Sequence, residues 1–340
     1  MISHSPPLAR AWRRLAGAHF LACLMLGCAF VALTSCATAG SFKIRSVKIA
    51  GTTCLLLRDV AGYYGMKYDF DDDKDVRLTS ASSTLVFTVD SRDAMVNTIK
   101  VSLSHAVTTW DDKPVVSEVD FRRLLDPILR SKALPRRTVA TLVIDAGHGG
   151  KDQGAEGDKC LEKDLTLAVA DQLATLLRKA GYTVKLTRSK DEYPTLEERV
   201  EVAKKEEADL FISIHANSAE DEDVNGIETF LLTPEGTTST YSDNTKDQAT
   251  AGNTFDKENA RLAYEVQRQL IRSTGQSDRG LKHAEFRVLR DAPCPAVLVE
   301  MGFITNSSDE KKMRSADHQR KIAKGLLEGI RSFERAVKKR

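Results

Sequence analysis

The sequence has 340 residues, of which 41% are hydrophobic and 29% are charged, and this composition is typical of a globular protein long enough for two domains. Its formal net charge is +2, and removing the three positive charges of Arg10, Arg13 and Arg14 in a predicted leader leaves −1. A near-neutral mature chain argues against nucleic acid as a partner.

Residues 1–36 have the order of a secretory signal. Three arginines precede an apolar run from Phe20 to Leu33 that is too short to span a bilayer comfortably, and small residues follow it. We therefore expect an exported protein of the periplasm or cell envelope. Leu33-Thr34-Ser35-Cys36 resembles a bacterial lipobox, which implies a lipid on Cys36 and membrane contact only through that anchor. Ordinary cleavage after Ala37-Thr38-Ala39 is the alternative.

Residues 42–130 are predicted to form a small α+β accessory module. Hydrophobic alternation and periodicity predict strands at 42–50 and 84–90 and a short helix at 56–64. His105 and Trp110 are interpreted as packed or exposed residues rather than as a ligand surface. The basic stretch 131–138, which contains Pro135, is the predicted linker.

Short runs in this module resemble the small N-terminal module of copper amine oxidases. They are Leu57-Arg58-Asp59-Val60-Ala61, Tyr64-Gly65 and Asp126-Pro127-Ile128-Leu129. The resemblance implies a binding or spacer role and no copper.

From residue 139 to 340 the pattern changes to strands that alternate with helices. The predicted strands are 139–145, 182–187, 210–214, 226–232 and 296–299, and the predicted helices are 162–180, 195–208, 259–271 and a C-terminal helix. This alternation predicts an α/β domain with a mostly parallel, twisted sheet covered by helices on both faces. Ligands of such sheets bind beyond the carboxyl ends of the strands.

Four chemistry-bearing side chains fall at these positions. His215 and Glu300 directly follow predicted strands, His148 lies in the loop just after another, and Glu162 opens the first predicted helix. Each one alone has an ordinary structural explanation, but together they suit a metal site. Two imidazoles and a carboxylate hold Zn²⁺ in a tetrahedron with one corner open for water, and the other glutamate then takes and returns protons.

Two other interpretations of these residues are weaker. Non-haem iron accepts the same donors, but the strand pattern of the iron oxygenases is absent. Five glycines lie between Gly147 and Gly157, yet the loop lacks the Gly-Lys-Ser/Thr ending of a phosphate cradle.

Five motifs in the second domain, in this order, resemble the zinc-dependent N-acetylmuramoyl-L-alanine amidases (amidase type 3). They are Ile144-Asp145-Ala146-Gly147-His148-Gly149-Gly150, Glu162-Lys163, Ser213-Ile214-His215-Ala216-Asn217, Gly226-Ile227-Glu228-Thr229 and Val299-Glu300-Met301-Gly302-Phe303-Ile304-Thr305-Asn306. The resemblance covers residues 141–335.

The resemblance implies that His148, Glu162 and His215 bind one Zn²⁺ and that Glu300 is the catalytic acid/base. It also implies peptidoglycan as the substrate, cleaved at the amide between N-acetylmuramic acid and L-alanine of the stem peptide. Asp145 and Asn217 are candidates for hydrogen-bonding the metal ligands. The alternative function is a non-catalytic, peptidoglycan-binding envelope lipoprotein, and the intact set of four residues favours the enzyme.

The segment Thr233–Lys257 is polar and lacks a helical apolar stripe. Some family members carry a helix here that blocks the active site until a protein activator removes it. We expect a solvated surface loop instead. His283 and Arg287 are further candidates for lining the cleft. Cys54, Cys160 and Cys294 remain in the mature body, so at most one disulfide can form; a bridge between Cys160 and Cys294 is the alternative, and we expect it to be absent.

Overall fold

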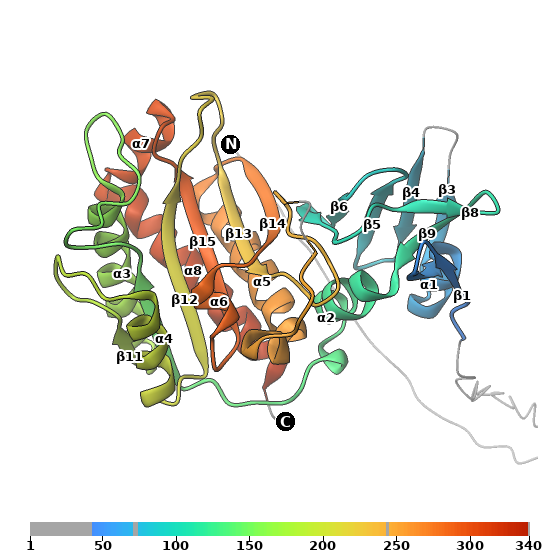
Figure 1. The fold of residues 1–340 in the computed structure, drawn as a ribbon, viewed down its shortest axis with the longest axis horizontal. Helices are drawn as coiled ribbons and strands as arrows, with labels where there is room; N and C mark the ends of the chain where they lie inside the picture. The colour runs from blue at the N-terminus through green and yellow to red at the C-terminus, as the bar shows by residue number, and fades with distance from the viewer. Residues whose placement is uncertain (1–42, 71–73, 243–244, 339–340) are drawn as a thin grey trace, which may run out of the picture. The chain divides into compact units, whose positions relative to one another are not determined.

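An 11-stranded mixed sheet is the central element of the computed structural model, which describes residues 43–70, 74–242 and 245–338 (Figure 1). The strand order is β11-β10-β12-β15-β13-β14-β7-β6-β5-β4-β3. The predicted leader, with Cys36, lies outside the described residues. Within the described part, no helix combines the length and apolar character needed to cross a membrane.

The second half of the chain supplies six strands of this sheet and the helices around them. Its elements are β10 (Thr141–Ala146), α3 (Glu162–Lys179), β11 (Thr183–Leu186), α4 (Leu196–Lys205), β12 (Leu210–Asn217), β13 (Ile227–Leu232), a 3₁₀ turn (Ala251–Phe255), α5 (Asp256–Thr274), β14 (Asp278–Ala284), α6 (Arg287–Arg290), β15 (Ala296–Phe303), α7 (Ser307–Met313) and α8 (Ala316–Val337). Strands β11, β10, β12 and β15 are parallel, whereas β13 is antiparallel to β15.

Helices cover both faces of the sheet, as the alternation of strands and helices predicts. Leu142 and Ile144 of β10 are buried in a core with α3, α5 and α8, whereas Val143 points to the other face, into a core with α4 and α6. Because side chains alternate along a strand, burial on both faces produces the continuous apolar runs seen in the sequence. The predicted α/β class is confirmed.

Two strands run further than the sequence indicated. His215 and Glu300 were expected just after their strands, but β12 continues to Asn217 and β15 to Phe303. The apolar run ends earlier than the strand because one face of the sheet becomes polar at the cleft while the backbone ladder continues. His215 and Glu300 are direct neighbours in this ladder.

The first half of the chain is built mainly from short strands. Its elements are β1 (Ser46–Ile49), β2 (Thr52–Leu56), α1 (Leu57–Tyr64), β3 (Lys67–Phe70), β4 (Asp75–Thr79), β5 (Thr84–Thr88), β6 (Asp93–Val96), β7 (Ile99–Ser102), β8 (Thr108–Trp110), β9 (Lys113–Ser117), a π-helical turn (Asp120–Leu125) and α2 (Asp126–Leu129), followed by a 3₁₀ turn (Ser131–Ala133). Strands β1, β2, β9 and β8 form a separate sheet.

The accessory strands continue the large sheet. Val101 of β7 pairs with Leu281 of β14, and the Lys282 ammonium donates to the Ser102 hydroxyl. The sequence did not predict β14, because Asp278–Ala284 is charged and contains Gly280. Residues 42–340 form one compact unit, and the domain boundary at 131–138 stays a prediction.

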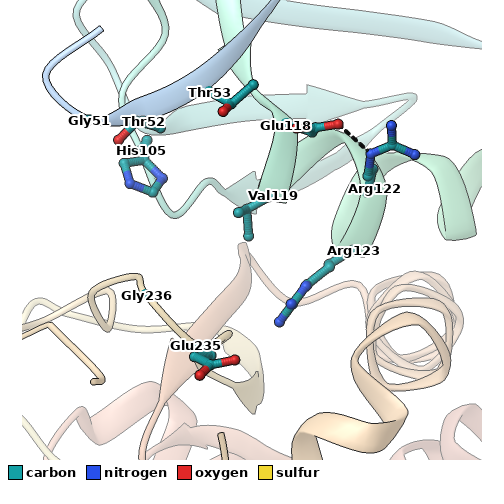
Figure 2. Close-up of a pocket in the computed structure, with 10 residues that line it drawn as sticks. All are labelled: Gly51, Thr52, Thr53, His105, Glu118, Val119, Arg122, Arg123, Glu235 and Gly236. Atoms are coloured by element: carbon teal, nitrogen blue, oxygen red, sulfur yellow. Dashed lines mark hydrogen bonds and ion pairs between the residues drawn. The ribbon is translucent and has the colours of Figure 1, made fainter. Parts of the chain in front are cut away.

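A cavity of about 510 Å³ lies beside the accessory strands (Figure 2). Its lining residues are Gly51, Thr52, Thr53, His105, Glu118, Val119, Arg122, Arg123, Glu235 and Gly236. Both arginines of the lining form ion pairs: Arg122 pairs with Glu118, which also lines the cavity, and Arg123 pairs with the neighbouring Asp256. Trp110 lies elsewhere and is 44% exposed, as expected.

Candidate metal centre

His148 is held by an irregular turn that follows β10. Its backbone is left-handed, with φ of 60°, a conformation that costs a non-glycine residue about 1–2 kcal/mol. Two buried arginines stabilise the turn. Arg188 donates to the carbonyls of Ala146 and Gly147, and Arg199 donates to the carbonyls of Ala146 and His148. The turn therefore presents the imidazole in one fixed direction.

Gly147 allows the two histidines to approach each other. A Cβ atom at this position would lie 2.4 Å from Cε1 of His215, far inside van der Waals contact. Only glycine leaves room for the second imidazole. The ring centroids of His148 and His215 are 4.9 Å apart, with the planes at 81°.

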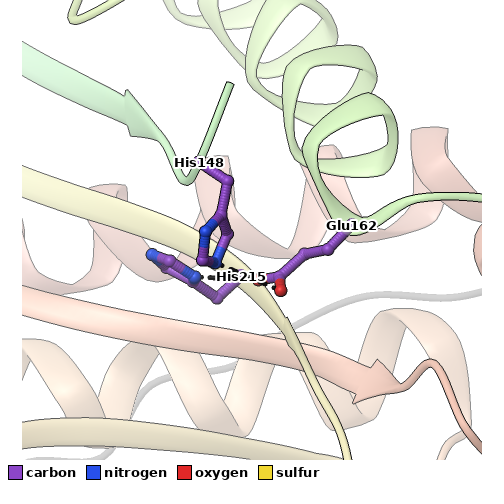
Figure 3. A group of neighbouring side chains, drawn as sticks. All are labelled: His148, Glu162 and His215. Carbon is purple, nitrogen blue, oxygen red and sulfur yellow. Dashed lines mark hydrogen bonds and ion pairs between the residues drawn. The ribbon is translucent and has the colours of Figure 1, made fainter. Parts of the chain in front are cut away.

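His148, Glu162 and His215 converge from three elements on one point (Figure 3). Nε2 of His148 lies 3.1 Å from Oε2 of Glu162, and Nδ1 of His215 lies 2.8 Å from Oε1. One donor atom from each of the three residues lies within 4.8 Å of the others. Such a group can hold a metal ion.

The Glu162 carboxylate is fixed by backbone as well as by the histidines. The amide of Ala155 donates to Oε2, and the amide of Ala216 donates to Oε1. Burial would raise the pKa of Glu162, but hydrogen bonds from His148 and His215 outweigh it and hold this pKa well below its ordinary range. Glu162 is therefore a carboxylate at neutral pH, as a metal ligand must be.

Asp152 is a functional candidate that the sequence reasoning missed. Its Oδ2 lies 2.9 Å from Nδ1 of His148. A carboxylate on this nitrogen keeps the proton on Nδ1 and leaves the Nε2 lone pair free for a metal. The signal available in the sequence was an aspartate four residues after the histidine in the same loop.

Asn217, the other candidate for supporting the metal ligands, does not hydrogen-bond the three converging residues in the described structure. Its side-chain amide donates to Oε1 of Glu228 at 2.8 Å, and its Oδ1 accepts from the amide of Ser218. The extra residues of β12 explain the difference, because Asn217 lies one step beyond His215 on the same face of the strand.

Glu300 is buried and faces the same cleft. It is 8% exposed, and its Oε2 has no hydrogen-bond partner among the described residues. Burial, together with the charges of Glu162 and Glu228, raises the pKa of Glu300 well above its ordinary value. A buried carboxyl oxygen without a protein partner is one that water or a substrate can engage.

The cleft between these groups has a volume of about 410 Å³. Its lining includes His148, His215, Glu300 and Asp152, with Tyr193, Pro194, Leu196, Phe286 and Arg287 among the residues of its walls. Tyr193, Leu196 and Phe286 are 40%, 47% and 38% exposed. Arg287 thus lines the cleft, as the sequence allowed, whereas His283 is buried and does not.

The sequence profile of the N-acetylmuramoyl-L-alanine amidases matches residues 142–332, which is more than half of the chain. The chain belongs to this amidase family. The family resemblance and the enzyme class that the motifs predicted are thereby confirmed.

Relatives of the amidase include proteins from several bacteria. The uncharacterized protein YqiI of Bacillus subtilis is 41% identical over 194 residues, covering 57% of this chain and 84% of YqiI. The N-acetylmuramoyl-L-alanine amidase LytC of the same species is 38% identical over 222 residues, covering 65% of this chain and 39% of LytC. The chain thus spans less than half of the length of LytC.

A solved structure supports the same fold. The N-acetylmuramoyl-L-alanine amidase from Clostridium difficile 630 is 33% identical and covers 58% of this chain and 97% of its own, with a TM-score of 0.50. The accessory module has no support from these comparisons.

The described part of the polar segment after β13 is more buried than a solvated loop. Thr237 and Lys246 are buried, and the Lys246 ammonium pairs with Glu285. The accessory residue Arg92 donates to the carbonyls of Thr238 and Ser239. Helical structure in the described part of 233–257 is confined to the 3₁₀ turn and the start of α5. The prediction of a surface loop is thus only partly right.

Cys54, Cys160 and Cys294 are free thiols.

Asp145 supports the amidase centre indirectly. Its carboxylate, a candidate for supporting a metal ligand, accepts from Arg199 at 2.7 Å and from the hydroxyls of Thr187 and Ser213. Burial alone would raise the pKa of Asp145, but the charge of Arg199 outweighs it and lowers this pKa. Asp145 therefore fixes Arg199, which in turn fixes the carbonyl of His148.

Asp145→Ala is expected to lower the free energy of unfolding by about 3–5 kcal/mol, because it leaves the Arg199 guanidinium buried and unpaired. Chemical denaturation monitored by circular dichroism measures this loss. Glu201→Ala is the matched control, since it removes only an exposed pair with Lys204 and should cost less than about 1 kcal/mol. Equal effects of the two substitutions would contradict the assignment.

Proposed function

We propose that this chain hydrolyses the amide between N-acetylmuramic acid and L-alanine of the peptidoglycan stem peptide. His148, Glu162 and His215 hold one Zn²⁺, and Glu300 is the acid/base. The observation that carries this proposal is the convergence of three ligand atoms within 4.8 Å beside a buried, unpartnered carboxyl oxygen. Membership of the amidase family supports the reaction type.

The residues present fit a zinc ion. Zinc takes imidazole nitrogen and carboxylate oxygen, and a catalytic site keeps three protein ligands and one open position. Here the set is two imidazoles and a carboxylate, and Asp152 and two backbone amides orient its members. Bound Zn²⁺ supplies a water with a pKa of about 7 and polarises the scissile carbonyl.

Glu300 is placed to move the proton. Its Oε2 has no hydrogen-bond partner among the described residues, so it can take a proton from the attacking water and deliver it to the leaving amide nitrogen. The other buried glutamate nearby, Glu228, is fully hydrogen-bonded and does not line the cleft. Glu300 is therefore the better candidate for this role.

Asp152→Ala is expected to weaken zinc binding by about 10- to 100-fold, because the His148 ring loses the partner that fixes its tautomer and orientation. Competition with a coloured zinc chelator measures the change. Asp158→Ala is the control, since Asp158 is an exposed aspartate of the same loop. An unchanged zinc affinity in Asp152→Ala would exclude this role.

One digestion tests the reaction itself. Purified peptidoglycan is incubated with the zinc-loaded protein, and mass spectrometry follows the products. Release of intact stem peptides with a free L-alanine amino terminus is expected. Retention of the protein on peptidoglycan without any release would favour the alternative, a non-catalytic wall-binding lipoprotein.

Export to the cell envelope agrees with relatives such as the probable cell wall amidase LytH of Staphylococcus aureus, to which this chain is 34% identical over 196 residues. We propose further that Cys36 carries a lipid anchor. Cells that express the full chain should incorporate labelled palmitate into the protein, and Cys36→Ala should abolish the label while Cys28→Ala does not. Equal labelling of both variants would count against the anchor.

A further inference from the structure

Glu228 is a buried carboxylate to which the proposed reaction assigns no part, although it belongs to one of the family motifs. It is 1% exposed and lies on β13, where it pairs in register with Glu300 of the antiparallel strand β15. Glu300 in turn pairs with His215 of β12. Residues opposite each other on neighbouring strands point to the same face. His215, Glu300 and Glu228 therefore form one row across the sheet.

The two glutamates of this row have opposite surroundings. Glu228 accepts hydrogen bonds from the Asn217 amide at 2.8 Å, from the Tyr241 hydroxyl at 3.2 Å and from Nε of Arg279 at 3.2 Å. Glu300 keeps one buried oxygen without any partner among the described residues. The donors on this part of the sheet, Asn217, Tyr241 and Arg279, therefore hydrogen-bond Glu228.

Arg279 is the donor with the greatest consequence for Glu300. Its guanidinium lies 4.8 Å from the ring centroid of Phe303 on β15, the strand that carries Glu300. A bulge in the pairing of β12 and β15 places Phe303 opposite Asn217, so Phe303 is the next residue after Glu300 on this face. The guanidinium is therefore already beside the strand of Glu300, and its ion pair with Glu228 keeps it engaged.

We infer that Glu228 is a positioning residue, which holds Arg279 away from Glu300 and so leaves Glu300 free to exchange a proton with water. The inference rests on the proposed role of Glu300. An arginine that pairs with a carboxylate occupies its oxygens with charge-assisted hydrogen bonds. Without Glu228, Arg279 pairs with Glu300, and Glu300 loses its function as an acid/base.

A double-mutant cycle tests this on the full-length, zinc-loaded protein, with a soluble muramoyl peptide as substrate. Glu228→Ala is expected to lower kcat by about 10²- to 10⁴-fold, as loss of the Glu300 acid/base would, with little change in KM or zinc content. Glu228→Ala combined with Arg279→Ala is expected to recover most of the lost kcat, because the competing guanidinium is gone. Arg279→Ala alone completes the cycle.

The recovery distinguishes positioning from simple support of the fold. If Glu228 only stabilises the sheet, the double variant is as impaired as Glu228→Ala or more so, and that result overturns the inference. Glu228→Gln keeps the side-chain volume and serves if Glu228→Ala does not fold, with the same recovery expected on adding Arg279→Ala. Full activity of a Glu300→Gln protein would instead refute the proposed function, independently of the cycle.

Discussion

Glu300→Gln is expected to retain the zinc content of the unaltered protein and to lose turnover by about 10²- to 10⁴-fold, the contribution typical of an acid/base group. Glutamine keeps the size of the side chain but cannot take a proton from water. The release of stem peptides gives kcat, and elemental analysis gives the zinc content.

The control for this substitution is Glu197→Gln. Glu197 is exposed and pairs with Arg287 at the cleft. It lies beside the cleft but outside the proposed chemistry, so its replacement should leave kcat within a few-fold of the original value. A Glu300→Gln enzyme as active as the Glu197→Gln enzyme would mean that another group moves the proton.

His148→Ala is expected to lose both zinc and activity, because the site then keeps only His215 and Glu162 as ligands. Catalytic zinc sites use three protein ligands, and the loss of one leaves too few for stable binding. Zinc content after dialysis and peptide release are measured together. A prolonged treatment with a chelator should reproduce the inactive state in the unaltered protein, and added Zn²⁺ should reverse it.

His105→Ala is the matched histidine control for that experiment. His105 lines the separate cavity beside the accessory strands and contacts none of the proposed ligands in the described structure. Zinc content and turnover should both be preserved in this variant. Retention of zinc by His148→Ala at the level of His105→Ala would show that the metal is bound elsewhere.

The sequence was sufficient for the large features of the catalytic half. Helix α3 at Glu162–Lys179 follows from its regular apolar spacing, and the buried strands follow from runs such as Val139–Ile144. The rule that the carboxyl ends of parallel strands meet at one edge predicts that His148, His215 and Glu300 lie close together. The choice of Glu162 as the third member of the group that the structure brings together came from the family resemblance.

The supporting contacts could not be predicted in the same way. In the sequence, Arg188 and Arg199 look like ordinary charged residues of a loop and a helix. In the structure, both are buried against the turn that holds His148. The partners of the candidates Asp145 and Asn217 could not be predicted, because hydrogen-bond choice depends on distances across strands and on a β-bulge. Such side-chain pairing is set by three-dimensional packing, which no periodicity in the sequence records.

Because the sheet is continuous across β7 and β14, separating the two halves of the chain would break the pairing of these strands. A fragment that starts at residue 139 would leave β14 with a bare edge, because its neighbour would be gone. Bare edges recruit other strands and favour aggregation. The accessory strands cover this edge, and we expect a fragment without them to give a lower soluble yield.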